Sequence, residues 1–263
     1  MRQCNDILSH TMFDEKDCNG LVLCDKFLPV EILTDIFFYV DYKTAMNCRL
    51  VCKRWQVLMN HVWYKKTNQT MAKPFPWDNN MPWSVFYLTC TKKPYGRNLL
   101  KDYSDTKDMD YWRSLNWRFR CNSYFWLERP MYVPNLKDII YHPRIQNVDL
   151  EDEGIHPYII DTYRPTIEIS EWINCREDHP PISYELTVEL VDINNKQVEQ
   201  FYTSYDIKRE EQNQRLQFLH TFEDYGIGVR KITFKHGEMN GLKMLRTCVS
   251  VKIPEKAFVL SQS

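Results

Sequence analysis

The segment 27–66 constrains the fold of this chain most strongly, because its apolar residues recur at the spacing of one helical face. The residues that follow this rhythm first are Ile32, Leu33, Ile36, Phe37 and Val40. Pro29 suits the first helical position, since its missing N–H would have no partner there. Asp41 suits the N-cap of a following helix. The segment therefore predicts a small helical domain over residues 21–67.

The second apolar run in this segment carries the same pattern onward. Its members are Ala45, Cys48, Val51, Cys52, Trp55, Leu58 and Met59, and Trp63 closes it. One interpretation is a small self-contained helical core. The other is a docking element, because so short a segment buries too little apolar surface to be stable unaided.

A proline-rich stretch over residues 68–82 follows the helical segment. It contains Pro74, Pro76 and Pro82, which disfavour both helices and central strands. We predict a semi-rigid linker there. Residues 1–20 are polar and predict a mobile N-terminal arm.

From residue 83 onward the period of the pattern changes from helical to alternating. After a short helix at 83–89, alternation predicts strands at 117–120, 166–170, 184–190, 198–204, 216–222, 229–235 and 248–253. Successive strands without long helices between them indicate an antiparallel β-sandwich over residues 83–263. The chain is thus predicted to be a multidomain α+β protein.

Composition restricts the cellular compartment and the classes of partner that we expect for this chain. The formal net charge is −1, which argues against nucleic acid or an anionic membrane as partner. The nine cysteines form no Cys-x-x-Cys pair, a pattern typical of reduced thiols. No signal peptide and no run of the ~20 apolar residues that span a membrane is evident. We expect a cytoplasmic protein without membrane insertion. The N-glycosylation pattern at Asn68 is therefore expected to be coincidental.

The sequence contains no constellation typical of an enzyme. Phosphate-binding, nucleophile-elbow and zinc-protease motifs are missing, and the histidines lack metal-ligand spacing. The acidic run at 151–153 could supply paired carboxylates, although such runs are usually solvated. We expect no catalytic residues, no metal and no cofactor.

The helical segment resembles an F-box. The motifs are Leu28-Pro29, Glu31-Ile32-Leu33 with Ile36, the run Arg49 to Trp55, and Val62-Trp63. The resemblance implies docking on the Skp-type adaptor of a cullin–RING ubiquitin ligase by helix-in-groove packing. The residues expected to make or support that interface are Leu28, Pro29, Ile32, Leu33, Ile36, Phe37, Leu50, Val51 and Trp55.

The second part of the chain resembles the F-box-associated domain, an antiparallel β-sandwich. The motifs are Arg97 to Leu100, Val148 to Leu150 with Glu153-Gly154, Asp161-Thr162, Tyr184 to Val188, His220 to Phe222, Asp224 to Gly226, Gly228 to Arg230, and His236-Gly237. The resemblance implies a substrate-recognition subunit of an SCF-type (Skp–cullin–F-box) ligase that recruits a target protein for degradation.

Some members of this group recognise N-glycans on misfolded glycoproteins, and this implies an alternative function as a lectin-like receptor in endoplasmic-reticulum-associated degradation. A sugar pocket needs an aromatic platform beside polar groups. Here the loop over 238–244 has no aromatic residue, so the candidates are Lys243 and Tyr141, the latter expected in a loop before residue 145.

Overall fold

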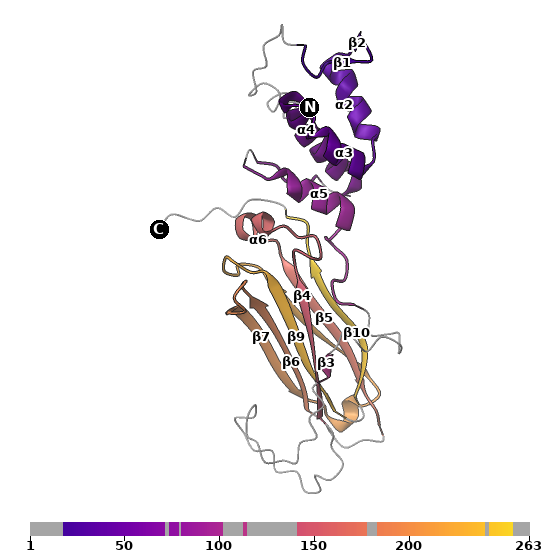
Figure 1. Ribbon diagram of the computed structural model, residues 1–263. Helices are drawn as coiled ribbons and strands as arrows, with labels where there is room; N and C mark the ends of the chain where they lie inside the picture. Colours follow the sequence, from indigo (N-terminus) through magenta and orange to yellow (C-terminus); the bar gives the residue numbers. More distant parts are fainter. Residues whose placement is uncertain are drawn as a thin grey trace. The chain divides into compact units, whose positions relative to one another are not determined.

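The computed structural model describes residues 18–71, 74–78, 80–101, 113–114, 141–177, 183–239 and 242–254. The chain divides into two compact units (Figure 1). The helical unit contains the described residues up to Tyr95, the segment Gly154–Tyr163 and the described residues from Ile253 onward. The sandwich unit contains the described residues of Gly96–Glu153 and of Arg164–Lys252.

The helical unit consists of five helices and a small hairpin in its described residues. They are β1 Val22–Leu23, β2 Lys26–Phe27, α2 Val30–Tyr39, α3 Tyr42–Cys48, α4 Lys53–Thr70, α5 Trp83–Lys92 and α6 Pro157–Tyr163. Their inward faces share one apolar core, which includes Leu33, Phe37, Leu58, Met59, Val62, Trp63, Phe86 and Ile159. The helical domain predicted from the periodicity of residues 27–66 is therefore part of a larger helical unit.

Helix α2 begins after Pro29, and its carboxyl end is held by a side chain of α4. Pro29 is its N-cap rather than its first helical residue, and the Pro29 carbonyl accepts the N–H of Leu33 at 3.0 Å. At the other end, Lys66 Nζ of α4 donates to the carbonyls of Phe38 (2.6 Å) and Val40 (2.9 Å). These carbonyls would otherwise lack intrahelical partners, so Lys66 holds the end of α2 against α4.

The second apolar run forms two helices, α3 and α4, instead of one continuous helix. The Asp41 side chain caps α3 by accepting the N–H of Thr44 at 3.0 Å, as predicted. The chain then turns, and the N–H of Leu50 donates to the Asn47 carbonyl before α4 begins at Lys53. Leu50 lies in this turn, and its side chain is exposed.

The segment predicted as a linker over 68–82 belongs in part to the helical core. Helix α4 continues to Thr70, and the Asn68 side-chain oxygen accepts the N–H of Phe75 at 2.9 Å. Phe75 is 2% exposed, and the Trp77 ring stacks on Phe86 of α5 at 5.2 Å. The prolines end the helix, but the aromatic residues between them bury apolar area in the core. The compact unit therefore extends to Tyr95, beyond the predicted boundary at residue 67.

Helix α6 also packs in the helical unit, although its sequence lies between two strands of the sandwich. The hydroxyls of Tyr158 and Tyr163 both donate to the Asp78 carboxylate, at 2.7 and 2.6 Å. Burial alone would raise the pKa of Asp78, but the hydrogen bonds from Tyr163 and Tyr158 outweigh it and lower the pKa. A charged carboxylate thus fastens α6 to the segment predicted as a linker.

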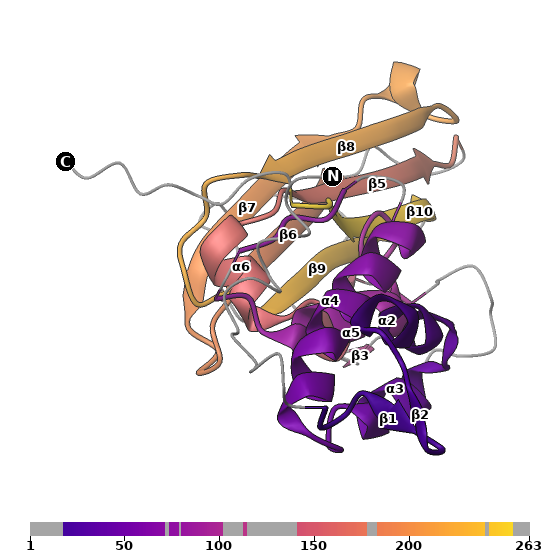
Figure 2. The ribbon, with the colours of Figure 1, turned by 90° about the horizontal axis from the view of Figure 1, so that it is seen from above.

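The sandwich unit has two antiparallel sheets, and Figure 2 shows them as two layers. The five-stranded sheet has the order β3-β4-β9-β6-β7, and the three-stranded sheet has the order β10-β5-β8. The strands are β3 Arg113–Ser114, β4 Tyr141–Asp149, β5 Ile167–Cys175, β6 Ser183–Val191, β7 Gln197–Asp206, β8 Arg215–Phe222, β9 Lys231–Met239 and β10 Leu242–Val251. The predicted antiparallel β-sandwich is confirmed.

Alternation of side chains explains the sandwich strands. In β6 the residues Tyr184, Leu186, Val188 and Leu190 are buried, and the residues between them face outward. The Asp192 carboxylate accepts the N–H groups of Asn194 and Lys196 at 2.8 Å each, which forms the turn to β7. The strand predicted at 229–235 begins and ends later, as β9, and the strand predicted at 248–253 begins and ends earlier, as β10. The strand predicted at 117–120 lies outside the described residues.

Residues 96–100 cover part of the free edge of β10. The N–H of Leu99 donates to the Val249 carbonyl at 2.8 Å. The Asn98 side chain accepts the N–H of Val249 at 3.0 Å and donates to the Thr247 carbonyl at 2.9 Å. A side-chain amide thus takes the place of a neighbouring peptide group and protects this edge from pairing with another chain.

Candidate functional site

Helix α2 presents apolar side chains on two different faces. Leu33 (0% exposed) and Phe37 (3%) point into the core. Ile32 (49%), Ile36 (43%) and Tyr39 (85%) follow the i, i+4, i+7 spacing on the outer side. A helix that only covered a core would carry polar residues there.

The turn between α3 and α4 adds two further exposed apolar residues, Leu50 (83%) and Val51 (60%). Next to them, the Arg49 guanidinium lies 3.7 Å from the centroid of the Trp83 ring, and burial lowers the pKa of Arg49. This cation–π contact fixes the turn to α5. We call Ile32, Ile36, Tyr39, Leu50 and Val51 together the apolar face.

The residues predicted to contact the adaptor divide into two groups. Those on the surface are Pro29, Ile32, Ile36, Leu50 and Val51, and Leu28 is half-buried. Those beneath the surface are Leu33, Phe37 and the half-buried Trp55. The Trp55 ring packs edge-on against Phe37 at 4.7 Å. The structure thus separates side chains that can touch a partner from side chains that support them.

Four exposed large apolar residues of the same unit are missing from the residues predicted from the sequence, and one of them, Tyr42 (37%), stacks on Trp63. Tyr39 lies within the helical segment, and its spacing from Ile32 and Ile36 is a usable signal. Val22 (48% exposed) and Phe27 (59%) lie in the β1–β2 hairpin. The turn of this hairpin has φ values of 49° and 61° at residues 24–25, a conformation that Asn-Gly usually signals. The Cys-Asp pair found there carries no such signal.

In the sandwich unit, Tyr141 and Lys243 flank one connection between the two sheets. Tyr141 is the first residue of β4 and pairs with Met239 of β9, so it belongs to a strand rather than to the predicted loop. Lys243 lies in β10 and pairs with Asn174 of β5. The connection between β9 and β10 is residues 240–241, much shorter than the loop predicted over 238–244, because both strands extend into it. The side chains of Tyr141 and Lys243 lie outside the described parts.

A polar cluster crosses the interior of the sandwich. Glu171 of β5 is fully buried, and its Oε1 lies 2.9 Å from His236 Nδ1 and accepts the Thr247 hydroxyl at 3.1 Å. The Tyr184 hydroxyl of β6 donates to Glu171 Oε2. Burial and the charge of Glu171 raise the pKa of Tyr184. The cluster joins the two sheets, and His236 has a structural role in it.

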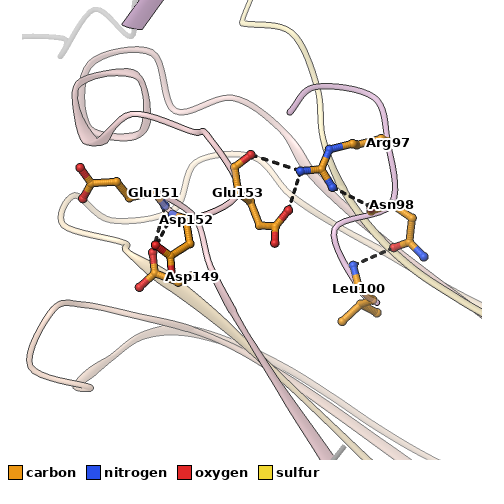
Figure 3. A network of polar contacts seen from close by, with 7 residues as sticks. All are labelled: Arg97, Asn98, Leu100, Asp149, Glu151, Asp152 and Glu153. Carbon is orange, nitrogen blue, oxygen red and sulfur yellow. Dashed lines mark hydrogen bonds and ion pairs between the residues drawn. The ribbon is translucent and has the colours of Figure 1, made fainter. Parts of the chain in front are cut away.

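Figure 3 shows how the acidic run at 151–153 is used. Arg97 Nη2 donates to Glu153 Oε2 at 2.5 Å and to the Glu153 carbonyl at 3.2 Å. The Asp149 carboxylate accepts the N–H groups of Glu151 and Asp152 at 3.1 and 3.2 Å. Glu151 and Asp152 are exposed. These groups stabilise a turn, and the run is not a pair of facing acids.

The described part of the chain holds no metal-binding cluster. No group of three or more His, Cys, Asp or Glu side chains among these residues could hold a metal ion. None of the helices in the same residues is long and apolar enough to cross a membrane.

Comparison with known families agrees with the two-part organisation. The model of the F-box associated region matches residues 90–254, more than half of the chain. The chain belongs to this family. An F-box-like model matches residues 26–69. The F-box associated match includes α6 and the end of α5, which pack in the helical unit, so the family boundary and the structural boundary differ.

Curated relatives of this F-box associated chain are F-box only proteins. F-box only protein 6 of Mus musculus is 29% identical over 80% of this chain and 75% of its own length. F-box only protein 44 of Homo sapiens is 29% identical over 80% of this chain and 86% of its own. F-box only protein 2 of Bos taurus is 29% identical over 72% and 68% respectively. These matches cover 72–80% of the chain, more than the F-box associated match alone.

Proposed function

We propose that this chain is the substrate-recognition subunit of an SCF-type ubiquitin ligase. In this proposal the apolar face of the helical unit docks on the Skp-type adaptor, and the sandwich unit holds the target protein. The observation that carries it is the outer stripe of α2, where Ile32, Ile36 and Tyr39 are exposed on a helix whose inner face is already buried. The F-box-like match over the same residues supports it.

The chemistry asked of this chain is positioning. Ubiquitin transfer belongs to other subunits of the ligase, and this chain contributes proximity between a target lysine and the loaded conjugating enzyme. Holding both reactants in one assembly raises their effective concentration. The five residues of the apolar face are 43–85% exposed, so docking can bury apolar area at each of them, and this burial must exceed the entropic cost of association.

The test is co-purification of the full-length chain with a Skp-type adaptor and a cullin from cells. Ile32→Glu with Ile36→Glu should abolish recovery of both partners, because two charges would be buried without counter-charges. The matched control is Leu219→Glu, an exposed leucine (64%) of the sandwich unit, which should leave recovery unchanged. Undiminished recovery with the double variant would contradict the proposal.

A second candidate function concerns the kind of target: the sandwich unit would bind N-glycans of a glycoprotein. Support for it is the position of Tyr141 and Lys243 on strands that adjoin the same β9–β10 connection. A glycan array should be probed with the full chain, since the segments 83–95 and 154–163 belong to the helical unit and a fragment starting at residue 83 would cut through a core. Retention on chitobiose-core glycans supports a glycoprotein target, and an array on which no glycan is retained contradicts glycan binding.

A further inference from the structure

The β1–β2 hairpin carries an apolar pair that lies outside the predicted adaptor-contacting residues. Val22 and Phe27 are directly opposite each other in register, so their side chains share one face of the hairpin. They are 48% and 59% exposed. Leu21 and Leu23 are partly buried and pack against the helical core. The hairpin thus has an anchored inner side and an apolar outer side.

The base of the hairpin lies against the turn that carries Leu50 and Val51. The Trp55 indole N–H donates to the Gly20 carbonyl at 2.6 Å. A Cβ atom on Gly20 would lie 2.7 Å from Cys52 Sγ and 2.9 Å from the Trp55 ring, and Gly20 has a φ of 79°. A glycine is therefore required for this close approach.

The second strand of the hairpin, β2, leads directly into α2. The N–H of Leu28 donates to the Leu21 carbonyl at 2.8 Å, which extends the pairing of β1 with β2 to the residue before Pro29. Phe27 is thus held a few residues ahead of Ile32, the first exposed large apolar residue of α2. The hairpin therefore adjoins both segments that carry the apolar face: it leads into α2 at one strand and contacts Cys52 and Trp55, next to Val51, through Gly20.

We infer that Val22, which precedes the F-box-like match, and Phe27, at its start, extend the adaptor-binding surface beyond α2 and the α3–α4 turn, and that their occupant is the same Skp-type adaptor. The inference rests on the proposed function. Contiguous exposed apolar surface marks an interaction site more often than scattered residues do. Because the hairpin adjoins both segments that carry the apolar face, a single partner that covers all of these residues is favoured.

The backbone of the hairpin is consistent with a surface that is held in place for binding. Cys24 and Asp25 both adopt left-handed conformations, which are unfavourable for residues with a Cβ. A hairpin with two-residue strands is marginal by itself. The Trp55 hydrogen bond and the packing of Leu21 and Leu23 therefore hold a conformation that local sequence would not select.

The experiment measures the dissociation constant of the full-length chain for a purified recombinant Skp-type adaptor by calorimetry. Val22→Thr with Phe27→Thr removes apolar surface and keeps residues suited to strands. We expect binding to weaken by roughly ten- to a hundred-fold, in line with the apolar area removed. The matched control is Tyr202→Thr with Leu219→Thr, two residues of similar exposure (56% and 64%) on strands of the sandwich unit.

A reference variant, Ile36→Gln, separates failure of this inference from failure of the proposed function. If Ile36→Gln weakens binding and the hairpin variant binds like the unchanged chain, the hairpin inference is overturned and the proposed function stands. If the unchanged chain does not bind the adaptor, the proposed function itself fails.

Amide exchange of the unchanged chain provides a second readout that does not depend on the folding of a variant. Adaptor binding should slow exchange at residues 21–28 together with α2. Protection of α2 without any change at 21–28 would overturn the inference.

Discussion

The two units of this protein differ in which unusual side chains they contain: exposed apolar ones in the helical unit and a buried charged one in the sandwich unit. The helical unit exposes large apolar side chains, with Tyr39 at 85% and Leu50 at 83%. The sandwich unit buries a carboxylate, Glu171, and satisfies it with three polar partners from both sheets. Several exposed apolar residues on one helix, as on α2, mark an interaction site more often than single exposed residues on separate strands, such as Leu219 (64%) and Tyr202 (56%) of the sandwich unit, do. We therefore propose that the helical unit is the part of the molecule that another protein covers.

The largest expected effect tests whether the sandwich is self-contained. Glu171→Leu keeps the approximate side-chain size but leaves Tyr184, His236 and Thr247 without their shared acceptor. We expect the free energy of unfolding to fall by about 3–5 kcal/mol, measured by chemical denaturation. The control is Glu168→Leu on the same strand, whose exposed pair with Lys252 contributes about 1 kcal/mol or less. Equal losses for the two variants would contradict a special role for the cluster.

The next prediction tests where the boundary between the two units lies. Ile159 of α6 is fully buried in the helical core although its sequence lies within the F-box associated match. Ile159→Ala should cost about 2–4 kcal/mol through lost burial and a cavity. Amide exchange should become faster in α4 and α5. Acceleration restricted to the sandwich strands would show that α6 belongs to the other unit.

A smaller effect is expected at Asp78, with a defined pH dependence. Its pKa in the folded protein is lowered, so the stabilisation is present above the ordinary value of 3.8 and is lost as the pH falls through the folded pKa. Asp78→Asn should cost about 2 kcal/mol at pH 7, since hydrogen bonds to a charged group are lost. Denaturation at pH 7 and pH 3 checks this, because the difference between variant and unchanged chain should shrink at the lower pH. A difference that is the same at both pH values would argue against a charged Asp78.

The smallest effect concerns the hairpin turn. Cys24→Asn with Asp25→Gly introduces the residue pair preferred for two left-handed positions. We expect a gain of about 0.5–1 kcal/mol in unfolding free energy. Adaptor affinity should rise by no more than a few-fold, since the hairpin is already anchored by Trp55. A loss of stability would contradict the left-handed conformation of these two residues.

Local features of the fold were predictable from the sequence, and long-range ones were not. The periodicity of Ile32, Leu33, Ile36 and Phe37 identified α2, and the cap at Asp41 identified the start of α3, because both depend on residues a turn apart. Alternation identified β6 for the same reason.

The packing of α6 in the helical unit depends on contacts between segments far apart in the chain, such as Tyr163 with Asp78, which no local pattern encodes. The Glu171 cluster likewise brings together residues of four strands. The sequence also could not separate exposed from buried members of the candidate site, because Ile36 and Phe37 are both strongly apolar and only packing distinguishes them.

Photo-crosslinking from Tyr39 tests the central claim most directly. A photoreactive phenylalanine derivative would replace Tyr39 in the full-length chain, and a second sample would carry it at Tyr202 of the sandwich unit, which is also exposed (56%). Irradiation with a purified Skp-type adaptor should crosslink the adaptor to position 39 and not to position 202. Crosslinks from position 202 alone, or equally from both positions, would contradict the assignment of the apolar face as the docking surface.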